Sequence, residues 1–240
     1  MPMELDMIGL TAKQRSACAQ TMSANTFYML VADALVSARA LSLVRMGDGE
    51  KYLYLHCKDR DPDQTVKPPN APFSEAWHRG LGCYDIPNGE MIRRLKLAAE
   101  TCDYFAPNIM GIQRDEFDVG SLFWQRREYV DNWCVREWSR KLQDNLLKQA
   151  GHVLFIHADW ETRTVFADRL GRLGVQSTGI EMSSWEHADG VMAAANHSIA
   201  QLVLFAGGPA GKHIAPLIAT GGSRPKVVLD LGHAFAENWL

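Results

Sequence analysis

The sequence predicts an α/β domain with a mostly parallel sheet flanked by helices, a Rossmann-like arrangement. In the second half of the chain, short apolar runs that suit buried strands alternate with amphipathic segments that suit helices. The turns between these segments are short, as they are where crossover helices connect parallel strands. A length of 240 residues and a hydrophobic content of 47% fit one large domain with a substantial core.

The chain begins with a polar lead-in, expected over residues 1–25, and a single domain is expected over residues 26–240. Apolar residues recur at helical spacing from Thr26 to Ala40, which predicts a buried helix. Residues 41–46, Leu-Ser-Leu-Val-Arg-Met, predict a strand that ends at the glycine-flanked acidic turn Gly47-Asp48-Gly49. The turn is therefore expected at the carboxyl end of a strand, where ligands bind in open α/β sheets.

The middle of the chain predicts a loop and three helices. Residues 59–72 are rich in Asp, Pro, Lys and Asn, which is typical of a loop. Helical spacing favours helices over residues 73–80 and 90–102, the second with Asn88 available as a cap. Apolar residues on one stripe then predict a single amphipathic helix over residues 130–147.

The second half predicts the clearest alternation of strands and helices. Strands are expected over residues 151–157, 175–180, 201–205 and 226–231. Asp159 is expected to cap a helix through Leu173 that closes at Gly174, and Ser183 and Glu186 have capping-box spacing before a helix that runs towards Ser198. A last helix is expected after the loop 207–212, with a kink at Pro216.

The charge and cysteine content disfavour several classes of protein. The net charge of −3 and the pI of about 6.2 lack the basic excess of proteins that bind nucleic acid mainly through phosphates. The 5 cysteines are scattered without a C-x-x-C pair, which disfavours a disulfide framework and a thiolate zinc site. No apolar run reaches the ~20 residues of a membrane span, and no signal peptide is recognisable, so we expect a cytoplasmic protein.

The acidic turn is the first candidate for a functional site. Asp48 and Glu50 lie two residues apart on a non-helical turn, so their carboxylates can converge on one hard divalent cation. Such an ion neutralises a pyrophosphate leaving group as a Lewis acid. Arg45, shortly before the turn, is suitably placed for phosphate charge. A solvated turn beside a surface arginine is the alternative interpretation of the same residues.

The glycine-rich loop Gly207–Lys212 is the second candidate. Glycines between a strand and a helix let backbone N–H groups approach a phosphate at the helix N-terminus. The loop is not a Walker A motif, because Ala206 and His213 occupy its first and last positions. It is not G-x-G-x-x-G either, so the fingerprint of nicotinamide binding is missing. A tight turn without a ligand is the alternative.

The segment after the last predicted strand is the third candidate. Asp230, His233 and Glu237 place two acids and an imidazole there, and His233 or Glu237 would accept a proton from an acceptor hydroxyl. An ordinary buried histidine in a C-terminal extension is the alternative. The segment 157–161, His-Ala-Asp-Trp-Glu, also follows a strand and could line the same cleft, although Asp159 already has a structural role as a helix cap.

Together these segments resemble one protein family. Leu43-Val-Arg-Met-Gly-Asp-Gly-Glu50, then Gly207-Gly-Pro-Ala, then Leu229-Asp-Leu-Gly-His233 occur in the order found in the bacterial glycosyltransferases of the GT-D type. The resemblance spans residues 41–240 and consists of these motifs, with the middle third of the chain poorly matched. It implies transfer of a sugar, often glucose, from a UDP-sugar with Mn²⁺ or a similar ion such as Mg²⁺.

The resemblance also implies roles for individual residues. The family's metal-binding pair falls on Asp48 and Glu50, and its catalytic-base glutamate falls on Glu237, with His233 as the other candidate. The family tail has the form G-H-x-D-x-E, and this chain departs from it with Phe235 at the position of the Asp. The residues then expected to bind the donor are Arg45, Gly47, Gly207, Gly208, Lys212 and Asp230.

Two alternatives from other classes of protein stay open at this point. One is a nucleotide- or phosphate-binding domain that uses the same loops without chemistry. The other is a metal-dependent phosphoesterase in which Asp48, Glu50, His157 and Asp159 share one metal site. For the glycosyltransferase, the acceptor is equally open: a glycan, a glycoprotein and a modified nucleic-acid base are all compatible with the sequence.

Overall fold

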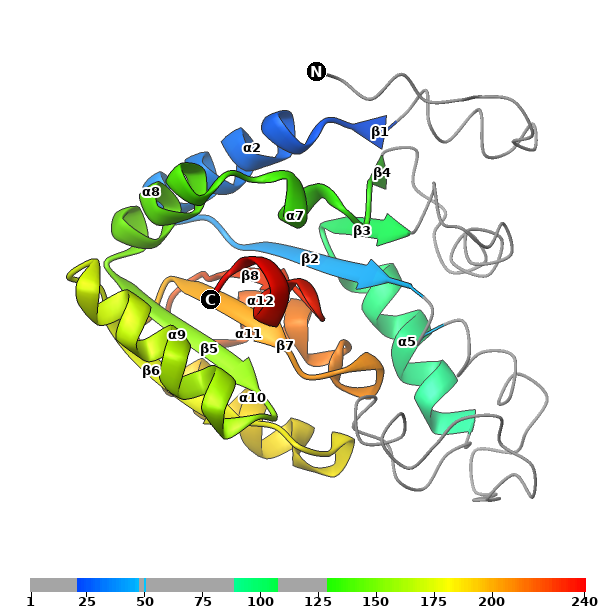
Figure 1. Ribbon diagram of the computed structural model, residues 1–240. Coiled ribbons are helices and arrows are strands. Elements are labelled where there is room, and N and C mark those ends of the chain that lie inside the picture. Colours follow the sequence, from blue (N-terminus) through cyan, green and yellow to red (C-terminus); the bar gives the residue numbers. More distant parts are fainter. Residues whose placement is uncertain (1–20, 48–49, 51–88, 108–128) are drawn as a thin grey trace.

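The computed structural model describes residues 21–47, 50, 89–107 and 129–240 (Figure 1). Across these residues, six strands form one parallel sheet in the order β3-β2-β8-β7-β5-β6. Their bounds are β2 Leu41–Met46, β3 Tyr104–Pro107, β5 His152–His157, β6 Gln176–Glu181, β7 Leu202–Ala206 and β8 Val227–Asp230. A separate short pair joins β1 (Thr21–Met22) to β4 (Tyr129–Val130), also in parallel. The expected parallel α/β fold is confirmed.

Helices cover both faces of the large sheet, which gives three layers (Figure 1). Those on one face are α5 (Gly89–Thr101), α10 (Ala188–His197) and α11 (Ile214–Gly221). Those on the other face are α2 (Ala24–Val36), α7 (Cys134–Glu137), α8 (Arg140–Ala150), α9 (Trp160–Arg172) and α12 (Ala234–Asn238). Each face of the sheet therefore has its own apolar core.

The burial of each strand follows from this layering. Every residue of β2 and of β8 is buried, because helices cover these central strands on both sides. The strand β6 lies at one edge of the sheet, and its residues Gln176, Ser177 and Thr178 are exposed. The strands and helices predicted for the second half are confirmed, including the cap at Asp159, whose carboxylate accepts the Thr162 N–H at 2.7 Å.

The single helix predicted for residues 130–147 is wrong. Its first residue belongs to β4 and residues 131–133 are not helical. The helices α7 and α8 follow, with a break between them. Trp138 has an extended backbone with ψ of 120°, and its indole donates to the Ala24 carbonyl at 2.9 Å. Ser139 then caps α8 by accepting the Leu142 N–H. Apolar spacing missed the break because a serine cap acts through local backbone bonds.

Two other predictions for the second half need correction. Ser183 does not cap the following helix: a 3₁₀ turn, η1 (Trp185–His187), comes first, and α10 begins after His187 without a side-chain cap bond. Pro216 does not interrupt its helix, because it is the third residue of α11. In the first turn of a helix the backbone N–H has no acceptor within the helix, so a proline costs no hydrogen bond there.

Several predictions fall on parts of the chain that are not described. The loop expected over residues 59–72, the helix over residues 73–80 and the cap Asn88 all lie outside the described residues, as does most of the expected lead-in over residues 1–25. Within the residues that the structure describes, no helix combines the length and the apolar character that crossing a membrane requires.

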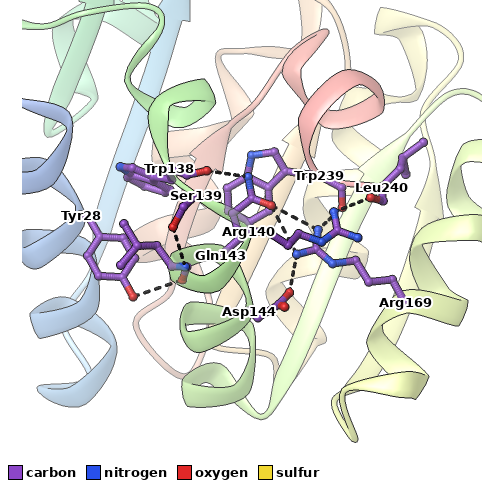
Figure 2. A network of polar contacts seen from close by, with 10 residues as sticks. Tyr28, Trp138, Ser139, Arg140, Gln143, Asp144, Arg169, Trp239 and Leu240 are labelled. Atoms are coloured by element: carbon purple, nitrogen blue, oxygen red, sulfur yellow. Dashed lines mark hydrogen bonds and ion pairs between the residues drawn. The ribbon is translucent and has the colours of Figure 1, made fainter. Parts of the chain in front are cut away.

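A buried arginine anchors the C-terminal helix α12 (Figure 2). Arg169 of α9 donates to the Trp239 carbonyl, lies 3.3 Å from Gln143 Oε1, and forms an ion pair of 2.5 Å with Asp144. Burial lowers the pKa of Arg169, and the hydrogen bond to Asp144 acts in the opposite direction. The Trp239 ring is fully buried and donates to the Val135 carbonyl at 3.3 Å. The end of α12 is thus fixed against α7, α8 and α9.

Candidate active site

The three segments singled out in the sequence meet at one edge of the sheet. All carboxyl ends of a parallel sheet lie on the same edge, which is the ligand edge of open α/β folds. Gly47 and Glu50 follow β2, the loop 207–212 follows β7, and residues 231–233 follow β8. Glu50 has a helical backbone, which differs from the non-helical turn expected for Asp48 and Glu50. Because β2, β8 and β7 are neighbours, these segments lie together although as many as 186 residues separate their contacts.

Lys212 joins the three segments. Its ammonium nitrogen lies 2.6 Å from Glu50 Oε1 and 2.9 Å from Asp230 Oδ2, and it donates to the Arg45 carbonyl. All of these side chains are buried: 7% of Lys212, 6% of Glu50 and 1% of Asp230 is exposed. A lysine ammonium has three N–H donors, so these three partners satisfy all of them.

Arg45 is the second buried cation of the site. Its Nε donates to the Asn132 carbonyl at 2.8 Å, and its Nη1 donates to the Leu231 carbonyl. Its backbone N–H donates to Asp230 Oδ2 at 2.9 Å. Burial lowers the pKa of the Arg45 guanidinium, and the negative charge of Asp230 opposes this effect. Arg45 therefore ties the end of β2 to the segment that leaves β8.

Arg45, Glu50, Lys212 and Asp230 form a neutral group of two cations and two anions, called here the buried ionic cluster. Burial alone would lower the pKa of Lys212, but the charges of Asp230 and Glu50 outweigh it, so the pKa of Lys212 is raised. Lys212 therefore stays charged. Removing Lys212 would leave two buried carboxylates without their cation, which typically costs ~3–5 kcal/mol.

The buried ionic cluster bears on the predicted ligand roles. Lys212 has no ammonium hydrogen left for a phosphate, and Arg45 holds backbone carbonyls. Both oxygens of Glu50 are engaged, since Oε2 accepts the Gly47 N–H at 2.8 Å. Each oxygen of Glu50 thus has one partner within the protein, and its predicted role as a metal ligand stays a prediction. Asp48, the other predicted ligand, lies outside the described residues.

Glu50, His157 and Asp159 belong to the described part of the chain, whereas Asp48 does not. Across residues 21–47, 50, 89–107 and 129–240, no three or more His, Cys, Asp or Glu side chains are arranged to hold a metal ion. The joint site imagined for a phosphoesterase would need Glu50 beside His157 and Asp159. Three strand spacings of ~4.8 Å separate β2 from β5, or ~14 Å between their backbones.

The predicted donor-binding glycines have different physical roles. Gly208 has φ of 72° and ψ of 176°, a conformation open essentially only to glycine. Gly207 is required by packing, because a Cβ there would lie 2.5 Å from the Phe205 ring and 2.7 Å from Met182 Sδ. A Cβ at Gly47 would lie 3.2 Å from Asn132 Nδ2. The loop after β7 therefore keeps its backbone close to the end of the strand.

The two predicted bases have different surroundings. His233 precedes α12, directly after Gly232, and its side chain is exposed. Glu237 lies one turn further along α12 and forms an ion pair of 2.9 Å with Arg136. Phe235, at the position where the resembled family has an acid, is fully buried. Its ring contacts those of Phe155, Phe166 and His157.

The sequence did not reveal every residue of the site. Asn132 was missed, although its carbonyl receives Arg45 Nε, because a backbone acceptor carries no side-chain signal. The contact between Arg94 of α5 and His213, with 3.2 Å between Nη1 and Nε2, was missed as well. These residues are far apart in the chain and share no motif, so the sequence does not indicate that they are in contact.

Comparison with known proteins identifies no relative of this chain, so its class is described from its fold and its candidate site. The chain matches no family model, no curated protein and no solved structure. It is a three-layer α/β protein whose parallel sheet carries a buried ionic cluster at its carboxyl edge, beside a glycine-rich turn and an exposed histidine.

Proposed function

We propose that this protein is a glycosyltransferase that moves a sugar, glucose or a related hexose, from a UDP-linked or similar nucleotide-sugar to an acceptor hydroxyl. One observation carries the proposal: Lys212 links the turn after β2, the loop after β7 and the end of β8 into one structure at the ligand edge. These are the three segments that carry the resemblance to the GT-D type glycosyltransferases. Segments that serve one site are expected to meet in this way.

The contacts of Glu50 support different roles for the two carboxylates of Asp48 and Glu50. Glu50 accepts the Gly47 N–H and pairs with Lys212, so its role is to position the turn. We propose Asp48 as the residue of this pair that contacts the divalent ion, Mn²⁺ or Mg²⁺. Such an ion supplies charge neutralisation for a diphosphate leaving group. The backbone N–H groups around Gly207 and Gly208 are proposed to bind the donor.

We propose His233 as the general base. Its exposed imidazole follows β8 at the ligand edge, whereas Glu237 already pairs with Arg136. In the reaction, the acceptor hydroxyl transfers its proton to an imidazole nitrogen, and its oxygen bonds to the anomeric carbon. The bond between that carbon and the diphosphate oxygen breaks, and the nucleoside diphosphate leaves with the bonding electrons. A general base of this kind contributes typically ~10²–10⁴-fold to the rate.

The experiment is a donor screen with purified protein. UDP-, GDP-, ADP- and TDP-sugars are incubated with and without Mn²⁺, and release of the nucleoside diphosphate is measured. We expect metal-dependent release from one donor, and its loss in Asp48→Ala at an unchanged melting temperature. Near-normal turnover by Asp48→Ala would contradict the proposed metal role.

Two other results of the screen would contradict the proposal and favour a different function. Nucleotide binding by calorimetry without any release, in the presence of Mn²⁺ and a mixture of simple sugar acceptors, would favour a binding domain without chemistry. Release of phosphate from simple phosphate esters, without preference for a sugar, would favour a phosphoesterase. The cytoplasmic location expected from the sequence stays a prediction, which fractionation of the producing cells would test.

A further inference from the structure

The ligand edge has a second half, at the ends of β5 and β6, which carries none of the residues proposed above for the metal, the donor or the base. From β5 the chain continues through α9 to β6 at the outer edge, whereas from β7 it continues through α11 to β8 on the other side. Neighbouring strands whose connections leave in opposite directions open a crevice at their carboxyl ends. His157 ends β5 at this point, beside Ala206 of β7 and Glu181 of β6.

His157 is held there in a defined orientation. Its ring stacks on Phe235, with centroids 5.3 Å apart and an angle of 26° between the planes. Its Nδ1 accepts the Asp159 N–H at 2.9 Å, so the proton of the neutral ring is on Nε2. Within the described residues, this Nε2–H has no hydrogen-bond partner, and the side chain is partly exposed. Burial lowers the pKa of His157, which favours the neutral donor.

Trp160 lies three residues beyond His157, as the first residue of α9. Its side chain is 68% exposed. Side chains of a helix lean towards its N-terminus, and the N-terminus of α9 follows directly from the carboxyl end of β5. Trp160 therefore lies at the ligand edge, three residues from His157. A flat apolar ring beside a fixed N–H donor matches the C–H face and the hydroxyl rim of a pyranose.

The charges next to His157 are already paired. Arg163 donates to the carbonyls of His157 and Ala158, at 2.7 and 2.8 Å, and forms an ion pair of 3.0 Å with Glu181. Asp159 is occupied as the cap of α9. This half of the edge thus offers a neutral donor and an aromatic face, which suit an uncharged polar ligand better than an anion.

From these contacts we infer that His157 and Trp160 form a binding subsite for a neutral saccharide. Trp160 stacks on the sugar ring, and the His157 Nε2–H donates to one hydroxyl. The inference rests on the proposed function, because the saccharide bound here is the acceptor. His157 stacks on Phe235, which lies two residues beyond His233, so a sugar on this subsite lies near the proposed base.

Nuclear magnetic resonance of labelled protein tests the subsite. Methyl α- and β-D-glucopyranoside, maltotriose and cellotriose are titrated to millimolar concentrations. We expect saturable shifts of the Trp160 indole N–H and of the His157 ring signals. Trp160→Ala should weaken binding about tenfold. Trp133→Ala is the matched control, since Trp133 is also exposed, at 45%, and its ring lies against Arg136 of α7.

The outcomes separate the subsite from the proposed function. Equal binding by Trp160→Ala, or no shift with any of the four sugars, would overturn the subsite. A larger response of these residues to inorganic phosphate or UDP than to the sugars would also overturn it. Donor hydrolysis is measured on the same sample. Hydrolysis without a sugar response contradicts the subsite alone, and a sugar response without hydrolysis supports the subsite and contradicts the glycosyltransferase.

Discussion

The carboxylate of Glu50 and the ammonium of Lys212 form an ion pair of 2.6 Å between two side chains that are almost completely buried. The pair connects the turn after β2 to the loop after β7, and Asp230 of the intervening strand β8 completes it at 2.9 Å from Lys212. The shape of the candidate active site therefore depends on charges that do not face the solvent. This dependence can be measured.

Replacing Lys212 with methionine should destabilise the protein by about 3–5 kcal/mol, because Glu50 and Asp230 would keep buried negative charges without a cation. Chemical denaturation measures the free energy of unfolding. Lys148→Met, at an exposed position of α8, is the control and should stay within about 0.5 kcal/mol of the parent. A loss of similar size in both variants would show that the buried ionic cluster does not contribute specifically.

Glu50→Gln and Asp48→Asn should have opposite profiles. Glu50→Gln removes one charge from the buried ionic cluster and should lower stability by about 1–3 kcal/mol, with a smaller loss of activity. Asp48→Asn should leave the melting temperature unchanged and abolish metal-dependent turnover. The two quantities are melting temperature and release of nucleoside diphosphate. A stable but inactive Glu50→Gln would assign direct ligand chemistry to Glu50 instead.

Gly208→Ala should destabilise the protein by about 1–3 kcal/mol, since its φ of 72° with ψ of 176° is closed to residues with a Cβ. Gly190→Ala is the counterpart. A Cβ at Gly190 would meet nothing within 4 Å, and the residue lies in α10, so alanine should be neutral or stabilise by up to about 1 kcal/mol. Thermal unfolding of both variants checks this contrast, and equal shifts would refute it.

Arg169→Met should cost about 3–5 kcal/mol, because it leaves Asp144 and the Trp239 carbonyl without their donor. Arg169→Lys should recover only part of this loss, since lysine lacks the planar fork that reaches several acceptors. Arg172→Met, at an exposed position near the end of α9, serves as the control. Full recovery by lysine, measured by chemical denaturation, would mean that charge alone accounts for the contact.

The pKa of His157 should be measured below its ordinary value of 6.5, since burial disfavours the charged ring. A group whose pKa is lowered on folding contributes stability above its unfolded pKa, and this contribution is lost as the pH falls through the folded pKa. Wild-type protein should therefore lose stability more steeply than His157→Gln below pH 6.5. The ring signal in a pH titration gives the value directly, and a midpoint above 6.5 would be inconsistent with this.

Much of the fold was predictable because it depends on local patterns. The strand at residues 41–46 and the cap at Asp159 were read from neighbouring residues, and both are confirmed. The break at Trp138 and Ser139 was not, because the apolar stripe continued across it. The indole of Trp138 finds its acceptor at Ala24, 114 residues away, and no local pattern records such a partner.

The sequence predicted which residues belong to the candidate site better than it predicted what those residues do. Arg45, Lys212 and Asp230 were expected to bind the donor, and the structure brings them together, but as partners of one another. A sequence pattern shows that a charged residue is present, but it does not show which group pairs with that residue in the folded protein. Whether a lysine faces a ligand or a buried carboxylate depends on the packing of β2, β8 and β7.

The Lys212 contacts also bear on when the site forms during synthesis. The turn after β2 emerges from the ribosome before its partners at Lys212 and Asp230, which are made more than 150 residues later. At ~5–20 residues per second, many seconds pass between the synthesis of Glu50 and that of Lys212, the cation that pairs with it. Until then no cation compensates for the hydration that this carboxylate would lose on burial. The site should therefore be assembled only after Lys212 and Asp230 have been made.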